Sequence, residues 1–412
     1  MKKLLVIFII FLFAVNLQAE EPLEKKPFRM RDRSFEMGFA NVDAGFANNL
    51  LTVSEIFRTK AIIDLTKMDK SFNLGFDLNV RPFYFNVSVK NQWGFGLDIG
   101  NVLVYGNVDL AANMLKLKHS ANNGDSFGVG ASAFVDIGIP AYFKIPNVWD
   151  KDLRINIRPA GFMTAVYTEP KMKYTFKEIT DGMLVQLDYD VRAYAPISLN
   201  FEEGGFDGFN VGPALGFDFS VGADYPLLPM LDVGIKFINI PLKSSLLQNY
   251  LEMKGKVSVD SSKLVIEDLI SGNDLPEDFL YLPDEYELNP VYGSNANKKT
   301  FRPFKMLLTA DYRPFETPIL TISPVLGFSV NQIFVQNGAI EIGVKASCEL
   351  ANLFTTTIGI CYEDQLWKNS LDFLLNLYVF ELGFGVAMQS QSFGSSWQGA
   401  GLRANLSLKF GF

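Results

Sequence analysis

Apolar and polar residues alternate along most of the chain, from about residue 70 to the C-terminus. In the last strand-like stretch, Leu402 to Phe412 place apolar side chains at even positions, and Arg403 to Gly411 place polar or small residues at odd positions. The same period of two recurs in residues 72–80, 127–139 and 382–388. Because successive side chains of a β-strand point to opposite faces, this pattern predicts strands with one apolar and one polar face.

A soluble β-sandwich and a transmembrane β-barrel would both show this alternation. The polar positions here hold mostly Gly, Asn, Asp and Ser, and the apolar positions hold Phe, Leu and Val without interrupting charges. Small polar residues suit a barrel interior, and an uncharged apolar face suits contact with lipid. The sequence therefore predicts an all-β fold, a transmembrane antiparallel β-barrel of about 14 strands, within a range of about 12 to 16.

The N-terminus indicates export. Met1-Lys2-Lys3 is basic, residues 4–15 are continuously apolar, and Leu17-Gln18-Ala19 fits a cleavage site. This pattern predicts a secretory signal peptide over residues 1–19, because the apolar run is shorter than the roughly 20 residues of a spanning helix. After it, no apolar stretch approaches that length, although 48% of all residues are hydrophobic and 37 are Phe. Such a chain either has a very large soluble core or presents its apolar face to lipid.

Charge and composition argue against several other classes of function. The net charge of −8 and the sequence pI near 5.0 do not suit a nucleic-acid-binding surface. His119 is the single histidine and lies beside the turn-like residues 122–125, so we predict neither a histidine-based metal site nor a Ser-His-Asp triad. No P-loop or Gly-x-Ser-x-Gly motif is present. We therefore expect no enzyme activity, no catalytic residue, no metal and no cofactor.

Two cysteines, Cys348 and Cys361, raise the question of a disulfide in an exported chain. Residues 340–350 and 353–362 resemble a hairpin that turns near Ala351. In that register the cysteines lie about 20 Å apart along the ladder, whereas a disulfide needs Cα atoms within about 7 Å. We expect two thiols that are not joined.

Two segments depart from the alternation. Residues 20–69 include Leu50, Phe57 and Leu65 in a helical spacing, which predicts an amphipathic helix in an N-terminal segment. We expect this segment to plug the lumen; the alternative places it beneath the barrel. The barrel would then occupy residues 70–412, with both termini in the periplasm. Counting strands back from the C-terminus makes residues 241–302 a long extracellular loop.

This architecture resembles the long-chain fatty-acid transporter family of outer-membrane proteins, of which the chain would be a divergent member. Residues 37–49 are similar to the start of that family's hatch, although the family's usual Asn-Pro-Ala triplet is absent. The resemblance implies passive uptake of hydrophobic small molecules such as long-chain fatty acids. An external apolar groove would capture them, and a kinked strand would release them sideways. The alternatives are a general diffusion porin for polar solutes, and a structural or assembly barrel that docks a periplasmic partner.

Several sets of residues are candidates for these roles. The barrel's partners would be a hydrophobic ligand, membrane lipid and, through the C-terminal strand, the barrel assembly machinery. The apolar residues of the long loop have an alternative role, which is to pack that loop onto the rim of the barrel. Prolines in strands cannot donate to the ladder, so one of them is a candidate for the kink. The candidates are Phe39, Asn41, Phe46, Asn48, Asn49 and Phe57 for the plug; Leu246, Leu247, Tyr250, Phe279, Tyr281 and Tyr286 for capture; Gly401, Leu408, Phe410 and Phe412 for the assembly signal; and Pro82, Pro159, Pro196, Pro213 and Pro324 for the kink.

Overall fold

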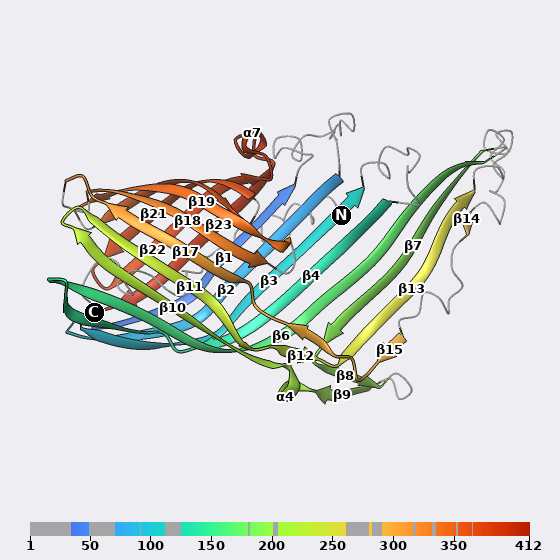
Figure 1. Ribbon diagram of the computed structural model, residues 1–412, viewed down its shortest axis with the longest axis horizontal. Coiled ribbons are helices and arrows are strands. Elements are labelled where there is room, and N and C mark those ends of the chain that lie inside the picture. The colour runs from blue at the N-terminus through green and yellow to red at the C-terminus, as the bar shows by residue number, and fades with distance from the viewer. Residues whose placement is uncertain are drawn as a thin grey trace.

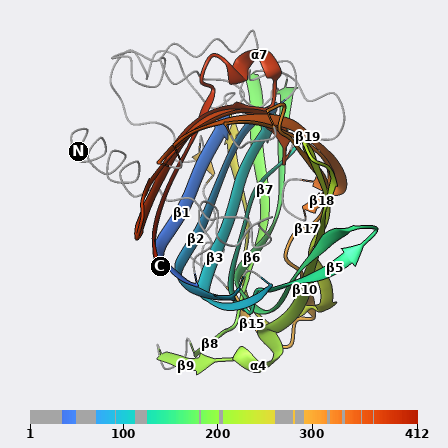
Figure 2. The same cartoon turned by 90° about the vertical axis from the view of Figure 1, so that its left-hand side faces the viewer.

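The computed structural model describes residues 34–48, 71–90, 92–111, 125–179, 182–200, 205–260, 280–281, 291–315, 319–331, 335–351, 353–364 and 366–412. Within them, fourteen antiparallel strands pair in one closed ring, which is seen end-on in Figure 2. The predicted barrel and its strand number are thus confirmed. The ring consists of β1 (Phe35–Asn48), β2 (Ser71–Val89), β3 (Trp93–Ala111), β4 (Asp125–Gly138), β6 (Lys151–Ile179), β10 (Leu215–Leu228), β11 (Leu231–Lys243), β17 (Phe304–Tyr312), β18 (Leu320–Asn331), β19 (Val335–Leu350), β20 (Phe354–Glu363), β21 (Leu366–Leu377), β22 (Phe380–Ser390) and β23 (Gly401–Gly411).

The first and last strands close the ring. β1 pairs with β23 from Glu36↔Gly411 to Ala47↔Gly401. Phe412 anchors this seam, because its carbonyl accepts hydrogen bonds from the backbone N–H groups of Ser34 and Phe35, at 2.7 and 3.1 Å. No sheet edge is left open in the ring, as a barrel in lipid requires.

The wall is polar inside and apolar outside. In β22 the odd positions, such as Glu381 and Gln389, are buried, while the even positions Phe384, Val386 and Met388 are about half exposed. This inversion of the soluble pattern follows from the alternation in the sequence and suits lipid outside and a polar lumen inside. The barrel fold fits an outer-membrane protein. Among the described residues, no helix is long and apolar enough to cross a membrane.

The two ends of the barrel differ. The end that carries Phe35 and Phe412, which we name the terminal rim, has short connections such as those after β10 and β21. At the opposite end, the loop rim, β6 continues far beyond its last pair with β10, at Met163, while β4 stays paired with it as far as Tyr174 (Figure 1). At 29 residues it is about 95 Å long, whereas a strand crosses a membrane in about 9–11 residues.

The outer half of β6 carries an additional sheet beyond the ring, which we name the extension. β7 (Gly182–Ala195) pairs with residues 167–179 of β6, and β13 (Asn249–Asp260) pairs with β7. β5 (Ala141–Val148) pairs with β3 and with residues 151–157 of β6 at the terminal rim. The other short elements lie at the loop rim or along the extension: β8 (Ile197–Asn200), β9 (Gly205–Phe209), α4 (Val211–Ala214), β12 (Ser245–Leu247), β14 (Leu280–Tyr281), β15 (Val291–Gly293), β16 (Lys298–Thr300) and α7 (Phe393–Ser396).

The predicted boundary between plug and barrel is wrong. Residues 35–48 form a strand of the wall, so Phe39, Asn41, Phe46 and Asn48 lie in β1 and not in a plug. The strand escaped the pattern analysis because its register shifts between Phe39 and Val42, which reverses the phase of the alternation. Asn49, Phe57, the expected helix around them and the expected signal peptide lie outside the described residues.

The long segment 241–302 is not a simple loop, since it contains β12, β13, β15 and β16. Leu247 is fully buried and packs with Tyr194 and Ala214, so it belongs to a small core at the loop rim. This packing corresponds to the alternative that the sequence left open for the apolar residues of the segment. The hairpin of β19 and β20 pairs Cys348 with Thr356 and Gly343 with Cys361, and no disulfide joins the two cysteines, as predicted.

Candidate functional site

A cavity of about 870 Å³ occupies the lumen and is lined from nearly every strand of the ring. Acidic and basic side chains predominate in its lining, including Asp77, Lys345 and Asp372. Many of them are joined in ion pairs. Within the described part of the chain, the surface of this cavity is therefore strongly polar.

One series of ion pairs starts on β2. Arg81 binds Asp98 of β3, and the Arg81 guanidinium also lies 3.6 Å from the centre of the Tyr84 ring. Arg158 of β6 donates from Nε to the other Asp98 oxygen at 2.8 Å. The side chains of Asp98 and Arg158 are 1% and 0% exposed, and buried charges of this kind are stable only when they are paired.

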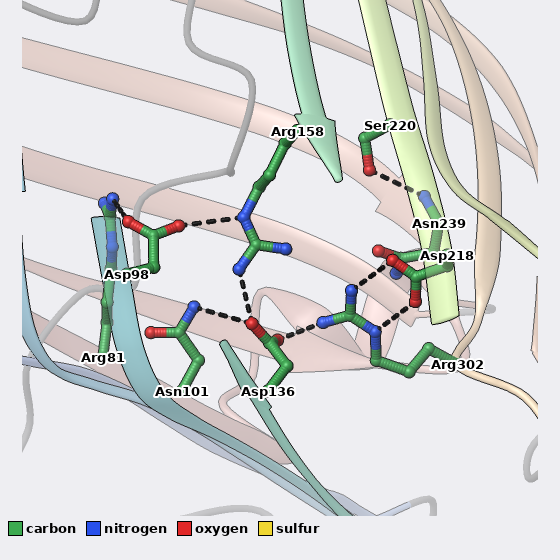
Figure 3. A network of polar contacts seen from close by, with 9 residues as sticks. All are labelled: Arg81, Asp98, Asn101, Asp136, Arg158, Asp218, Ser220, Asn239 and Arg302. Carbon is green, nitrogen blue, oxygen red and sulfur yellow. Dashed lines mark hydrogen bonds and ion pairs between the residues drawn. The ribbon is translucent and has the colours of Figure 1, made fainter. Parts of the chain in front are cut away.

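The series continues through Asp136 of β4 to the segment before β17. One Asp136 oxygen accepts from Arg158 Nη2 at 2.5 Å and from Asn101 Nδ2 at 3.3 Å. Its other oxygen accepts from Arg302, whose Nε and Nη2 also donate to Asp218 of β10 at 2.6 Å each. These side chains come from β2, β3, β4, β6 and β10 and from Arg302, two residues before β17. Figure 3 shows them pointing toward one another. We name this series the charge chain: Arg81, Asp98, Arg158, Asp136, Arg302 and Asp218.

A second group of ion pairs lies nearer the loop rim. Lys305 of β17 binds Glu341 at 3.1 Å and Glu363 at 2.8 Å. On the other side of the ring, Arg403 of β23 binds Asp43 at 2.6 Å and Asp77 at 2.8 Å. The charges of the lumen are therefore fixed in position on both sides of the cavity.

Next to the charge chain, three neighbouring strands each contain one extra residue. β1 has an extra residue relative to β23 between Phe39 and Val42. β3 has one relative to β4 between Ile99 and Asn101. β2 pairs with β1 and with β3 without a register shift. At this level β1, β2 and β3 therefore each have one more residue than the flanking strands β23 and β4. Rows of this kind bend a sheet locally.

The ladder is broken where this row crosses β2 and β3. The pairs Phe83↔Ile99 and Val80↔Val102 are formed, but none is formed at Pro82 and Gly100, which lie between them. Pro82 has no N–H to donate, and Gly100 has a φ of 70°, which favours glycine. We name this place the wall interruption. Pro82 was one of five candidate prolines, whereas Gly100 was not singled out.

The two faces of the wall interruption differ in chemistry. On the lumen side, Arg81 is a member of the charge chain, and Asn101 donates a hydrogen bond to its member Asp136. On the lipid side, Phe39 and Phe83 lie 5.4 Å apart between ring centres, and Phe39 lies 6.0 Å from Phe410 of the predicted assembly signal. The broken ladder thus separates a charged surface from an aromatic one.

The extension carries a row of three tyrosines across its three strands. Tyr167 and Tyr250 flank Tyr194 at ring-centre distances of 6.4 and 5.7 Å. The Lys298 ammonium lies 4.5 Å from the centre of the Tyr167 ring. A cavity of about 300 Å³ lies between Tyr194, Tyr250 and residues 294–298. Tyr250, one of the predicted capture residues, lines this cavity.

Charged side chains follow the tyrosine row outward. Arg192 Nη2 and Lys254 Nζ bind the same Glu252 oxygen at 2.7 and 2.6 Å. These bonds hold the pKa of Glu252 below its usual range, Lys254 having the larger effect. In turn, the bond to Glu252 raises the pKa of Lys254.

The other predicted site residues are dispersed. Leu246 pairs with Lys299 between β12 and β16, Tyr281 pairs with Ser258 between β14 and β13, and Phe279 and Tyr286 lie outside the described residues. Gly401, Leu408 and Phe410 lie in β23, and Phe412 follows it at the seam. The charge chain was not predicted, because its members are far apart in sequence. The one available signal was the recurrence of single Asp or Arg residues at lumen-facing positions.

No protein-family model and no curated protein matches the chain. Among solved structures, it is similar to FadL-type transporters, as the sequence resemblance leads one to expect. The Pseudomonas putida toluene transporter TodX shares 9% identity at a TM-score of 0.45, covering 93% of this chain and 91% of that one. A Pseudomonas aeruginosa FadL homologue shares 9% identity at 0.45, covering 92% and 89%, and the Ralstonia pickettii toluene transporter TbuX shares 9% at 0.41, covering 92% and 89%. At these scores the likeness adds no argument of its own, and the barrel is assigned from its strand pairings.

Proposed function

We propose that the chain is an outer-membrane transporter for the passive uptake of hydrophobic small molecules such as long-chain fatty acids. The observation that carries this proposal is the wall interruption at Pro82 and Gly100, which has an aromatic patch on its lipid side. In lipid, each unsatisfied backbone group costs several kcal/mol, so a broken ladder within the wall of a barrel is expensive. Irregularities of this kind persist where they serve a function.

The polarity of the lumen supports a sideways route. An apolar molecule cannot pass a cavity crossed by fixed ion pairs without a large desolvation cost to those charges. An exit through the wall would let the molecule leave beside Phe39 and Phe83 and enter the lipid directly. In this proposal the termini are periplasmic, the extension lies outside the cell, and the cavity beside Tyr250 contributes to capture.

The wide polar cavity favours a second candidate, a diffusion porin for polar solutes. The two candidates differ in the route and in the solute. A porin would conduct ions through the lumen in proportion to voltage and would not need the wall interruption. The transporter would bind hydrophobic molecules saturably and conduct poorly.

The first test is the binding of a labelled long-chain fatty acid to the purified barrel, with a boiled sample as the control. Heat-shifted gel mobility verifies folding. Saturable binding by the folded form alone is the expected result. Ohmic conductance in planar bilayers without such binding would support the porin and contradict the transporter.

The second test closes the wall interruption. Val80 and Val102 are paired beside it, and residues directly opposite each other are close enough for a cross-strand disulfide. We expect the Val80→Cys/Val102→Cys variant, in a background with Cys348→Ser and Cys361→Ser, to lose cellular fatty-acid uptake when oxidised and to regain it when reduced. The matched control is Leu74→Cys/Val108→Cys, which joins the same two strands farther from the wall interruption. Equal uptake by both oxidised variants would rule out this exit.

A further inference from the structure

Arg302 lies where the long segment 241–302, which we name the insertion, meets the lumen. It lies between β16 and β17, two residues after Thr300. Thr300 is fully buried and its hydroxyl lies 2.7 Å from that of Thr164 on β6, so the end of the insertion is held against the wall. The Arg302 side chain is 4% exposed and bridges two carboxylates. Its position therefore depends on both the insertion and the ring.

Asp136 transmits this position to the next arginine. One of its oxygens binds Arg302 and the other binds Arg158, so the carboxylate holds the two cations at fixed places. Arg158 is fully buried, and its guanidinium lies against the backbone of Gly138, where an added Cβ would be 2.3 Å from the guanidinium carbon. Arg158 thus has no room on that side to follow a displaced Asp136 while keeping its bond to Asp98.

Asp98 connects the charge chain to the wall interruption. It lies two residues before Gly100, and it binds Arg81, which directly precedes Pro82. Asn101, which directly follows Gly100, donates to Asp136 itself. Each strand at the wall interruption is therefore tied to the charge chain by a residue next to the broken pair.

From this geometry we propose that Arg302 is a positioning residue that couples the insertion to the wall interruption, through Asp136, Arg158 and Asp98. Arginines and aspartates alternate along the charge chain, so displacement of one member leaves the series with one buried charge in excess, and the remaining members rearrange together. When the insertion draws Arg302 away, the restraint on β2 and β3 beside Pro82 and Gly100 is released. This inference rests on the proposed function only in treating the wall interruption as an exit; the coupling itself is a property of the barrel.

The test compares Arg302→Met with Arg313→Met. Arg313 follows the other end of β17 and forms an ion pair with Asp232 at 2.6 Å, away from the charge chain. Amide hydrogen exchange in peptides that cover residues 80–102 is the readout, with heat-shifted mobility as the check of folding. We expect Arg302→Met to raise exchange there at least about tenfold, to leave residues 354–377 unchanged, and Arg313→Met to have no effect at residues 80–102.

Two outcomes would overturn the coupling: unchanged exchange in Arg302→Met, or an equal rise across the whole barrel. If Arg302→Met does not fold, Arg302→Lys keeps the charge with fewer bonds and is expected to raise exchange at residues 80–102 by a smaller factor. Exchange does not depend on a transported molecule. If the oxidised disulfide variant still takes up fatty acid but Arg302→Met raises exchange at residues 80–102, the exit is rejected and the coupling is kept. If the disulfide blocks uptake but Arg302→Met leaves exchange unchanged, the coupling alone is rejected.

Discussion

Lys409 of β23 and Glu381 of β22 face each other across the ladder, with Nζ 3.3 Å from Oε1 and side chains that are 1% and 2% exposed. The pair lies on the lumen side, three residues from the C-terminus. It shows that the final strand contributes to the polar interior as well as to the lipid-facing surface. In a site this well buried, neither charge can turn to solvent when its partner is removed.

We predict that Lys409→Ala lowers the free energy of unfolding by about 3 to 5 kcal/mol, because Glu381 loses a buried cation. Urea unfolding in detergent micelles measures the change. The double variant Lys409→Met/Glu381→Leu should lose less than the single variant, since it removes both charges and keeps the volume. A double variant less stable than Lys409→Ala would contradict this account.

Gly100 is expected to resist substitution for reasons of backbone geometry. At a φ of 70°, a residue with a Cβ costs about 1 to 2 kcal/mol, although no atom lies within 4 Å of the added carbon. Gly100→Ala should therefore lower the free energy of unfolding by about that amount. Gly161→Ala is the matched control, because its Cβ would make an ordinary contact with Phe217 at 3.5 Å and no positive φ is needed. If both variants lost the same free energy of unfolding, the positive φ of Gly100 would not be the cause of the loss.

The seam between the termini leads to a prediction about assembly. The Phe412 ring lies 5.5 Å from that of Phe35, and its backbone binds both Ser34 and Phe35. We predict that deletion of Phe412 reduces the yield of heat-modifiable barrel in the outer membrane several-fold, while Phe412→Tyr retains most of it. The measurement is the fraction of protein that shifts in mobility on heating. Normal assembly without the terminal aromatic residue would show that β1 and β23 close without it.

The barrel could be predicted from the sequence, because strands with lipid on one side and a polar lumen on the other must alternate apolar and polar residues. β1 was missed where the shift between Phe39 and Val42 reversed that period. One extra residue exchanges the apolar and polar positions of the strand, so a search for uninterrupted alternation does not detect it. The same irregularity is what gives the wall its unusual local structure.

The charge chain could not be predicted for a different reason. Arg302 and Asp136 are 166 positions apart, and their contact depends on the registers of several strands between them. Proline chemistry placed Pro82 among the candidates for a kink, but four other prolines satisfied the same criterion. The missing pair opposite Gly100, which is apparent only from the register of β2 and β3, distinguishes it from them.

Acid is expected to destabilise the extension through Glu252, which binds Arg192 and Lys254. The pKa of Glu252 is held below its usual range by Lys254 first and Arg192 second, so its charged form stabilises the pairing of β7 with β13. A carboxylate with a depressed pKa contributes stability that is present above its ordinary pKa, about 4.3, and is lost as pH falls through its lower folded value. After correction for intrinsic rates, hydrogen exchange at residues 249–258 should therefore rise relative to residues 354–377 once the pH falls below about 4. Glu252→Gln lacks the titrating group and should show faster exchange at neutral pH with a weaker dependence on acid. If the variant retained the full acid dependence, the stabilising carboxylate would have to be another residue.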